Sequence, residues 1–229
     1  YRTRLSDGRE SWYSRDQYKR ITRQIDFEGR ETQQEYNEAG QLTKIVQPNG
    51  GVIRFAYDEK GNLIETKDPE GNIWKKEYDA DGNVIKEINP LGQSTSYKYN
   101  AQGQVVEVID AKGGKKSIQY NDLGQMLSYS DCSGKESAWE YDETGTLLQQ
   151  QDATAQAVQY LYSDQGIDKG QLKTIIYPDG LKEHFEHDQE GRLLKHIDTA
   201  GKATLYSYNQ TGLLQQRIDA NKHQIGYQW

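Results

Sequence analysis

The sequence contains a single cysteine, Cys132, so the chain cannot form an internal disulfide. No apolar run reaches the roughly 20 residues that a membrane-spanning helix needs, and no secretion signal is recognisable. Hydrophobic residues make up only 34% of the 229 residues, which is too few for a thick dry core. The net charge is −7 with no block of basic residues. Nucleic acid is therefore not expected as a partner, because binding it depends on neutralising phosphates.

Tyrosine, in contrast, is abundant and regularly spaced. The 17 tyrosines include a series that recurs every 21 residues from Tyr57 to Tyr141, and most members open the pattern Tyr-Asp/Asn-x-x-Gly. A fixed period near 20 residues indicates a repeat architecture. The residues that define the repeat are Tyr36 and Gly40, Tyr57 and Gly61, Tyr78 and Gly82, Tyr99 and Gly103, Tyr120 and Gly124, Tyr141 and Gly145, and Tyr208 and Gly212.

Each repeat carries two turn signals, the tyrosine pattern at 57–61 and an Asp-x-x-Gly pattern at 68–71. Asp or Asn at the start of a turn can hydrogen-bond the main chain two residues on, and glycine at its end accepts a positive φ. About six or seven residues remain between turns, which is near the usual strand length. The spacing predicts an antiparallel meander with two strands per repeat.

Residues within the expected strands suggest how they pair. Aromatic residues fall two apart, as at Phe55 and Tyr57, and so share one face of a strand. The next strand opens with an aliphatic pair such as Leu63 and Ile64, whose first member should lie near the preceding tyrosine. Repeated along the chain, these pairs would form a ladder on one face of the sheet.

The expected fold class is all-β. About ten repeats give about twenty strands, which would span about 95 Å at the usual strand spacing. Strand twist accumulates over so wide a sheet, so it cannot stay flat. We expect tandem hairpin repeats of about 21 residues that form a long twisted antiparallel sheet, curling into part of a hollow spiral shell.

The repeat phase predicts one continuous array over residues 1–229. The start, 1–35, is degenerate, the repeats are regular over 36–162, a four-residue insertion lengthens 162–187, and the phase resumes over 187–229. Ala155 and Lys222 replace turn glycines, and Trp229 stands at a tyrosine position. The insertion is expected to be a longer hairpin loop, with a partner-contact loop as the alternative. Because Tyr1 begins inside a repeat, the chain is expected to be a segment of a longer array.

The motif Tyr-Asp-x-x-Gly-x-Leu or its Asn variant, in phase through the chain, resembles the YD-repeat family, also called RHS repeats. The resemblance implies a hollow shell of the kind found in bacterial secreted toxins and effectors, in insecticidal toxin complexes and in animal adhesion receptors. In the bacterial members the shell encloses a C-terminal toxin polypeptide. Those proteins also carry a self-cleaving module after the repeats. Its signature is not matched here, since Asp68-Pro69-Glu70-Gly71 is an ordinary in-phase turn.

No catalytic, cofactor or metal residue is assigned from the sequence. Carboxylate pairs such as Asp79 and Asp81 recur as turn residues, and a calcium-loop reading of 77–82 lacks the expected ligand at its far end. His184 and His187 should point to opposite faces of a strand, which argues against zinc. Cys132 lies in an expected turn and is interpreted as incidental.

The function expected is that of a structural shell segment, not an enzyme, in a secreted or extracellular protein. Its partners would be the remaining repeats of the full-length protein and an enclosed toxin polypeptide. The alternative is a module that binds carbohydrate or protein through exposed Tyr and Trp side chains, with Trp74 and Trp139 as the test positions. An enzyme is the third hypothesis.

Overall fold

The computed structural model describes residues 2–5 and 7–229, so the expectation about Tyr1 lies outside the described residues. The chain divides into two units, residues 1–115 and 116–229. The described residues form strands and turns with no helix. The all-β fold of hairpin repeats is therefore confirmed, whereas one continuous array over the whole chain stays a prediction.

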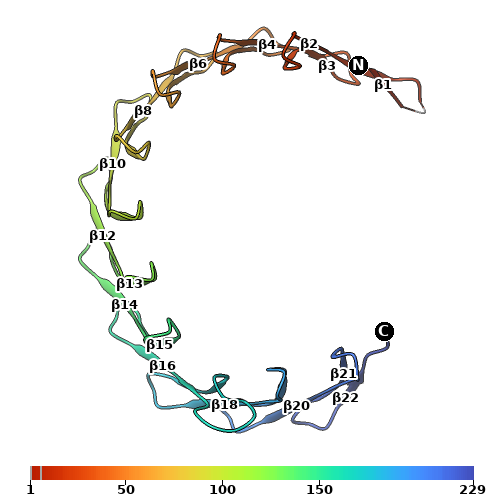
Figure 1. Ribbon diagram of the computed structural model, residues 1–229, viewed down its shortest axis with the longest axis vertical. Coiled ribbons are helices and arrows are strands. Elements are labelled where there is room, and N and C mark those ends of the chain that lie inside the picture. Colours follow the sequence, from red (N-terminus) through yellow and green to blue (C-terminus); the bar gives the residue numbers. More distant parts are fainter. Residues whose placement is uncertain (1, 6) are drawn as a thin grey trace. The chain divides into compact units, whose positions relative to one another are not determined.

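The first unit is a meander in which each strand pairs antiparallel with the next. Taken by itself, its sheet bends steadily instead of lying flat, as its course from β2 to β10 shows (Figure 1). Its strands are β1 (Arg2–Arg4), β2 (Glu10–Arg15), β3 (Ile21–Ile25), β4 (Glu31–Tyr36), β5 (Leu42–Val46), β6 (Val52–Tyr57), β7 (Leu63–Lys67), β8 (Ile73–Tyr78), β9 (Val84–Ile88), β10 (Ser94–Tyr99) and β11 (Val105–Ile109).

The second unit repeats this meander with the same antiparallel pairing of successive strands. Its strands are β12 (Lys115–Tyr120), β13 (Met126–Ser130), β14 (Glu136–Tyr141), β15 (Leu147–Gln151), β16 (Ala157–Tyr162), β17 (Leu172–Ile176), β18 (Lys182–His187), β19 (Leu193–Ile197), β20 (Ala203–Tyr208), β21 (Leu214–Ile218) and β22 (Gln224–Gly226).

The strand register confirms the expected tyrosine–aliphatic pairs and adds a bulge. Tyr57 pairs with Leu63, while the preceding Ala56 pairs with Glu65. Ile64 is therefore an extra residue, and two residues of β7 oppose one of β6. The same irregularity recurs in every hairpin that starts from a tyrosine position, from Arg15 to Tyr208. Such bulges bend a strand and increase its local twist, so the repeat carries a built-in source of curvature.

The sheet has no hydrophobic core of the usual kind. No hydrophobic side chain among the described residues is buried, and the buried residues are Ser128, Ser163 and Thr174. The units are thus one sheet layer thick, and both faces reach solvent. This agrees with the low hydrophobic content of the sequence.

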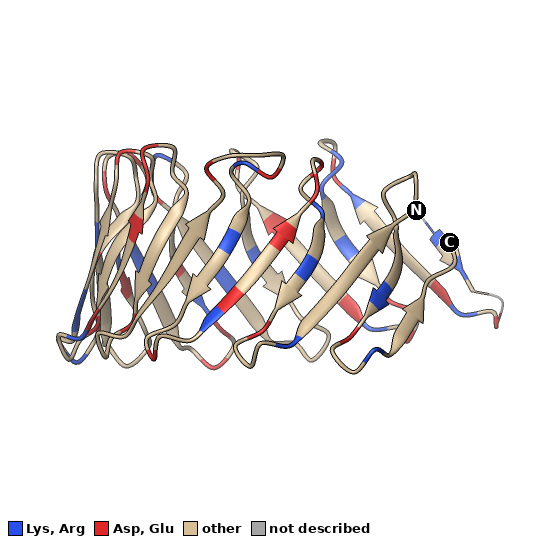
Figure 2. Ribbon diagram, turned by 90° about the horizontal axis from the view of Figure 1, so that it is seen from below, with Lys and Arg blue, Asp and Glu red and all other residues tan. Residues whose placement is uncertain are grey.

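Alternation along the strands separates two faces. We call the face that carries Phe55, Tyr57 and their equivalents the aromatic face, and the other the polar face. Ion pairs cross neighbouring strands on the polar face, as between Lys44 and Glu35 at 2.7 Å. Further pairs join Lys195 to Glu186 at 2.8 Å and Glu107 to both Lys98 at 2.8 Å and Lys115 at 2.6 Å. Acidic and basic residues are interspersed along strands and turns (Figure 2).

The four-residue insertion lies in the hairpin between β16 and β17, as expected. Ser163 N–H donates to the Gln171 carbonyl at 2.9 Å, which closes the loop at its base. The buried Ser163 hydroxyl donates to the Gln165 carbonyl at 2.9 Å and to Asp168 at 3.0 Å. The loop is therefore internally held, and its role in contacting a partner stays a prediction.

Candidate functional site: tyrosine rungs, turn caps and the aromatic face

In six hairpins, the tyrosine at the end of the first strand bonds the preceding hairpin. Tyr57 Oη donates to the Leu42 carbonyl at 2.8 Å. Leu42 lies opposite Tyr36 at the bulge of the earlier hairpin, where the regular ladder is interrupted. We call this bond a rung. Equivalent rungs join Tyr36 to Ile21 (3.0 Å), Tyr78 to Leu63 (2.8 Å), Tyr99 to Val84 (2.7 Å), Tyr162 to Leu147 (2.8 Å) and Tyr208 to Leu193 (2.9 Å).

Desolvation of the phenols accompanies the rungs. Burial raises the pKa of Tyr99, Tyr162 and Tyr208 above its ordinary value. Tyrosine hydroxyls are protonated at neutral pH without any shift, and this shift extends the alkaline range over which these three remain donors. The other two repeat tyrosines, Tyr120 and Tyr141, end their strands in the same register, opposite Met126 and Leu147.

Two residues at the tyrosine position show what the rung requires. Trp229 donates through its indole Nε1 to the Leu214 carbonyl at 2.8 Å, so a different ring supplies the same bond. His187 occupies the position in β18, but its buried Nδ1 has no partner within the described part of the chain. At His187, therefore, a ring nitrogen is removed from water without gaining a hydrogen bond in return.

The Asp or Asn that follows the tyrosine caps the turn. Asp58 Oδ1 accepts from the main-chain amides of Lys60 at 3.0 Å and Asn62 at 2.8 Å, and Oδ2 accepts from the Asn62 side chain at 3.0 Å. These bonds, led by the Asn62 side chain, hold the pKa of Asp58 below its usual value. Asn100 makes the same main-chain contacts without a charge, so the cap depends on the oxygen and not on ionisation.

Three turns begin with a residue that cannot cap in this way, namely Leu5, Gln47 and Tyr177. In each, an Asp or Asn two residues later accepts from the amide after the turn glycine. Asp7 accepts from Arg9 at 3.0 Å, Asn49 from Gly51 at 2.9 Å, and Asp179 from Leu181 at 3.0 Å. Sequence analysis missed this second cap, although an Asp-Gly or Asn-Gly pair signals it in all three turns.

The turn glycines hold a left-handed backbone. Among the seven glycines that define the repeat, φ ranges from 77° at Gly103 to 93° at Gly61. The expected glycine substitutes keep this conformation, with φ of 62° at Ala155 and 66° at Lys222. Lys19, at φ 65°, is a third substitute that the sequence analysis did not single out.

The two ends of the strands differ in how the turns pack. At the tyrosine turns, Gln41 Nε2 donates to the Gly61 carbonyl of the next repeat at 2.8 Å, and Gln125 does the same to Gly145 at 2.7 Å. A Cβ added at Gly61 would lie 3.1 Å from the Gln41 amide. At the Asp-x-x-Gly turns, a Cβ on Gly71 would meet nothing within 4 Å. We call these ends the packed rim and the open rim.

Arginine takes the place of this glutamine in two repeats. The Arg20 guanidinium lies over the Tyr36 ring, 4.7 Å from its centroid, and Arg192 lies over Tyr208 at 5.1 Å. Each arginine also pairs with the cap of its own turn, Arg20 with Asp16 at 2.7 Å. In these two repeats, the capping aspartate, the arginine and the tyrosine of the next repeat therefore form one connected set of contacts at the packed rim.

The structure gives little support to the calcium and zinc sites that were considered from the sequence. Asp79 uses its carboxylate to cap the turn, accepting from the amides of Asp81 and Asn83, which favours the turn reading over calcium. His184 and His187 lie at alternate exposed and half-buried positions of β18, as expected for opposite faces. No group of three or more His, Cys, Asp or Glu in the part of the chain that the structure describes could hold a metal. Cys132 is exposed in its turn.

A polar cluster on the aromatic face was not foreseen. Glu183 accepts from the Tyr177 hydroxyl at 3.1 Å and lies 2.7 Å from His196 Nε2. His196 stacks on Phe185 with ring centroids 4.9 Å apart. The cluster draws on a turn and on two strands, β18 and β19, so no local sequence pattern could have indicated it.

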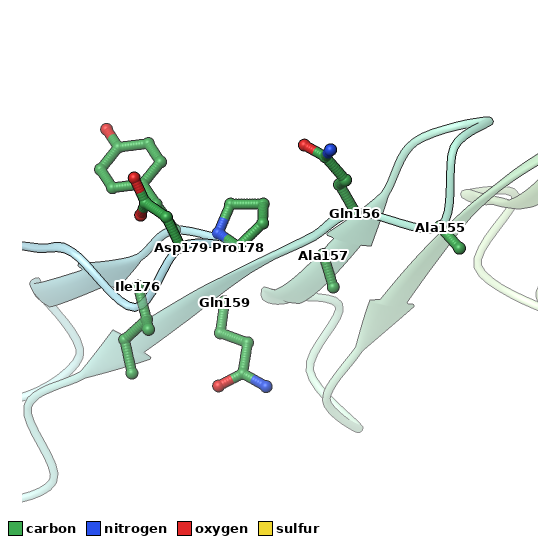
Figure 3. A pocket seen from close by; sticks show the side chains of 8 residues that line it. Ala155, Gln156, Ala157, Gln159, Ile176, Pro178 and Asp179 are labelled. Atoms are coloured by element: carbon green, nitrogen blue, oxygen red, sulfur yellow. The ribbon is translucent and has the colours of Figure 1, made fainter.

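Shallow hollows lie beside the open rim. Two contain tryptophan: Trp74 lines one of about 240 Å³ with Lys76 and Glu87, and Trp139 lines another of about 360 Å³ with Gln150. A third, of about 570 Å³, lies between β16 and β17 (Figure 3). In it Ala157, Gln159 and Ile176 point to one side of the ribbon and Gln156 to the other. The two tryptophans named from the sequence are therefore both accessible.

The repeats match a known family model. The model described as RHS Repeat matches residues 36–73, 78–115, 120–166 and 187–224, which is more than half of the chain. The chain belongs to the RHS repeat family. The RHS match begins at Tyr36, where the regular repeats were expected to begin. It omits most of the lengthened repeat, 167–186.

Three solved structures to which this RHS chain is similar are much longer than it. The crystal structure of TcdB2–TccC3–Cdc42 has 13% identity and a TM-score of 0.48, covering 91% of this chain and 15% of that one. TcdB2–TccC3 has 14% identity and a TM-score of 0.40, with 98% and 18% covered. The Tc holotoxin pore of Photorhabdus luminescens, with a TccC3 D651A mutation, has 14% identity and a TM-score of 0.36, with 96% and 17% covered. The chain thus spans less than a fifth of each, and no curated protein sequence matches it.

Proposed function

We propose that this RHS chain is part of a structural wall that encloses a polypeptide, a toxin domain, within a longer secreted protein. The observation that carries the proposal is the absence of any buried hydrophobic side chain among the described residues. A one-layer sheet devotes its residues to surface and not to a core, which gives the largest enclosed volume per residue. Membership of the RHS repeat family supports the same role.

The aromatic face suits an incompletely folded cargo. Its tyrosines and tryptophans combine an apolar ring with a polar atom, so they can contact a chain of varied sequence without a dedicated site. The Ser, Gln and charged residues that lie among them keep this face hydrated. The wall would therefore act by enclosure and not by catalysis.

Binding of an unfolded polypeptide by the purified chain tests this role. We expect weak binding of a reduced and alkylated protein, measured by fluorescence anisotropy, and no binding of the same protein when native. Trp74→Ala should weaken binding, because Trp74 is 41% exposed on the aromatic face. Glu77→Ala, on the polar face of β8 and outside the hollow that Trp74 lines, is the control and should change nothing. Equal effects of the two substitutions, or no binding at all, would contradict the proposal.

The location of the protein is also a proposal. RHS repeats are expected in secreted toxins, and the described residues contain no helix that could cross a membrane. Recovery of the full-length protein from the culture medium of producing cells is the expected result. Retention of all of it inside intact producing cells would contradict secretion.

A second candidate function is carbohydrate binding at the Trp139 hollow. Its volume of about 360 Å³ falls within the range of small-ligand sites, and Gln150, Gln156 and Asp152 surround the ring with hydrogen-bonding groups. A glycan array should then show binding that Trp139→Ala removes and that Glu140→Ala, on the polar face, preserves. Sugar binding that survives Trp139→Ala would exclude this hollow as the site.

A further inference from the structure

We propose that Asn49 is a site of spontaneous covalent modification, at which the side-chain amide is lost to an attack by the main-chain nitrogen of Gly50. Asn49-Gly50 is the only Asn-Gly pair in the 229-residue sequence. Glycine has no side chain to shield its nitrogen, so this pair allows the ring closure that bulkier residues hinder.

The turn leaves both reacting groups accessible. Asn49 and Gly50 are exposed at the open rim, and a Cβ at Gly50 would meet nothing within 4 Å. Asn49 Oδ1 accepts from the Gly51 amide at 2.9 Å. This donor would also stabilise the negative charge that develops on the oxygen during the attack.

The turn lacks the first-position Asp or Asn cap that most turns of the chain have. Gly50 N–H donates to the Gln47 carbonyl at 2.9 Å, and this bond must open before the nitrogen can attack. In most turns an Asp or Asn at the first position accepts two main-chain amides and resists such opening, as Asp219 does from Asn221 at 2.8 Å and His223 at 2.9 Å. Gln47 occupies the first position here, and Asn49 provides the cap instead.

The reaction needs no oxidant and no co-reactant except water. A bond forms between Gly50 N and Asn49 Cγ, the Cγ–Nδ2 bond breaks, and the Gly50 proton leaves with the departing ammonia. Water then opens the five-membered imide. Breaking the bond from Cγ gives aspartate, and breaking the bond from the main-chain carbonyl carbon gives isoaspartate, whose main chain is longer by one carbon.

The two products differ in how they fit the turn. Aspartate would reproduce the turn at 177–180, where Asp179 accepts from Leu181 at 3.0 Å. Isoaspartate would break the spacing that the Gln47–Gly50 bond requires. Either product adds a negative charge to a hollow of about 560 Å³ that Arg30 also lines.

Incubation of the folded chain in ¹⁸O-labelled water at mildly alkaline pH tests the proposal. Trypsin cleavage after Lys44 and Arg54, and after Arg217 and Lys222, releases the segments 45–54 and 218–222, each with a single Asn. Mass spectrometry should find ¹⁸O entering residue 49 about tenfold or more faster than residue 221. Asn221 is the matched control, because it holds the same turn position but precedes Lys222, whose φ is 66°.

A second variant tests the contribution of the turn. Gln47→Asp restores the first-position cap and should slow labelling of residue 49 severalfold without changing the circular dichroism spectrum. Equal labelling of residues 49 and 221 in the folded chain would overturn the proposal. So would a folded chain that takes up no label at 49 while the chain in denaturant does.

Discussion

A rung tyrosine has two roles at the scale of the residue, since its ring packs against neighbouring side chains, as Tyr36 does against Arg20, and its hydroxyl bonds a carbonyl fifteen residues earlier. The two can be separated by mutation. Tyr, Trp and His at this position differ in the donor they present while all offer a flat ring. The structure therefore contains its own comparison of what the donor contributes.

Tyr78→Phe should remove the donor and keep the ring. The Leu63 carbonyl, bonded at 2.8 Å, would lose its partner at the bulge, and we expect a loss of about 1 kcal/mol in the free energy of unfolding. Urea denaturation measures the change. Tyr18→Phe is the control, since Tyr18 is 68% exposed and should have no effect. Equal losses for both variants would mean that the rung hydroxyl contributes nothing specific.

His187→Tyr should stabilise the second unit. The substitution removes a buried Nδ1 without a partner and introduces a hydroxyl at a position where tyrosine elsewhere bonds a carbonyl. We expect a gain of about 1 kcal/mol, read from the thermal or urea transition. His223→Tyr, on an exposed turn, should give no gain. A destabilised H187Y variant would show that the longer loop before β17 has displaced the carbonyl acceptor.

The turns are the elements that distinguish the two rims. Turn glycines at both rims have positive φ, so substitution by alanine carries the strain of a left-handed residue, about 1–2 kcal/mol, at either rim. At Gly61, Gly145 and Gly191 the packed rim adds a steric cost, because an added Cβ would approach the glutamine of the preceding turn. Ala155 shows that the open rim accepts alanine in this conformation.

Gly61→Ala should therefore cost more than Gly71→Ala. The φ values are 93° and 91°, so backbone strain is matched, but only the new Cβ at residue 61 approaches the Gln41 amide, at 3.1 Å. Urea denaturation of the two variants gives the difference. Adding Gln41→Ala should recover part of the cost at residue 61 and none at residue 71. Equal costs would indicate that both rims are equally open.

Turn caps should also make stability depend on pH. The folded pKa of Asp58, lowered by its bonds to Asn62, lies below the unfolded value. The same sign holds for Asp79 and Asp142, and the Arg23 guanidinium lowers the pKa of Glu31 to about 2. These groups stabilise the fold above the ordinary carboxyl pKa and lose that contribution as pH falls through the folded values, between about pH 5 and pH 2.

Asp58→Asn should reduce this pH dependence while keeping the turn. Asn makes the same main-chain contacts at Asn100, so the variant should fold normally at neutral pH. Its urea midpoint should fall less on acidification than that of the unmodified chain. A midpoint that falls equally in both would assign the acid sensitivity to other carboxyls.

Sequence spacing predicted the elements but not all of their details. Pairing of Tyr57 with Leu63 follows from turn length, because a short hairpin loop fixes the register. The bulge at Ile64 could not be predicted, because the alternation of side chains along a strand assigns residues to its two faces and does not reveal an inserted residue. Two local exceptions were also missed: Asn49 caps its turn from the third position instead of the first, and Lys19 adopts the left-handed conformation that glycine holds in most turns. The Glu183–His196 contact joins two strands and depends on the register between them.

For the whole molecule, the central fact is that stability comes from neighbour contacts and not from a shared core. Within each unit, successive strands pair and rungs join one hairpin to the hairpin before it, so the free energy of a unit should be close to a sum over its repeats. The ion pairs, caps and rungs are all of this local kind. Hydrophobic burial contributes less than in an ordinary domain of this length.

Calorimetry should show this directly. Exposure of apolar surface raises the heat capacity on unfolding and exposure of polar surface lowers it, with typical domains giving about 12–15 cal/mol/K per residue. A chain with no buried hydrophobic side chain among its described residues should fall clearly below that range. A value within the range, at dilutions where the chain is monomeric by sedimentation, would show that more apolar surface is covered than the fold suggests.

The rung also determines how such a protein can change in length. Its donor lies in one repeat and its acceptor in the repeat before, at a constant offset of fifteen residues. Duplicating or deleting a whole period leaves every remaining donor facing an equivalent acceptor, wherever the cut is made. Extension or shortening by complete repeats would then require no compensating change elsewhere. A gain or loss of a few residues within a strand, in contrast, would move the tyrosine hydroxyl away from its carbonyl acceptor.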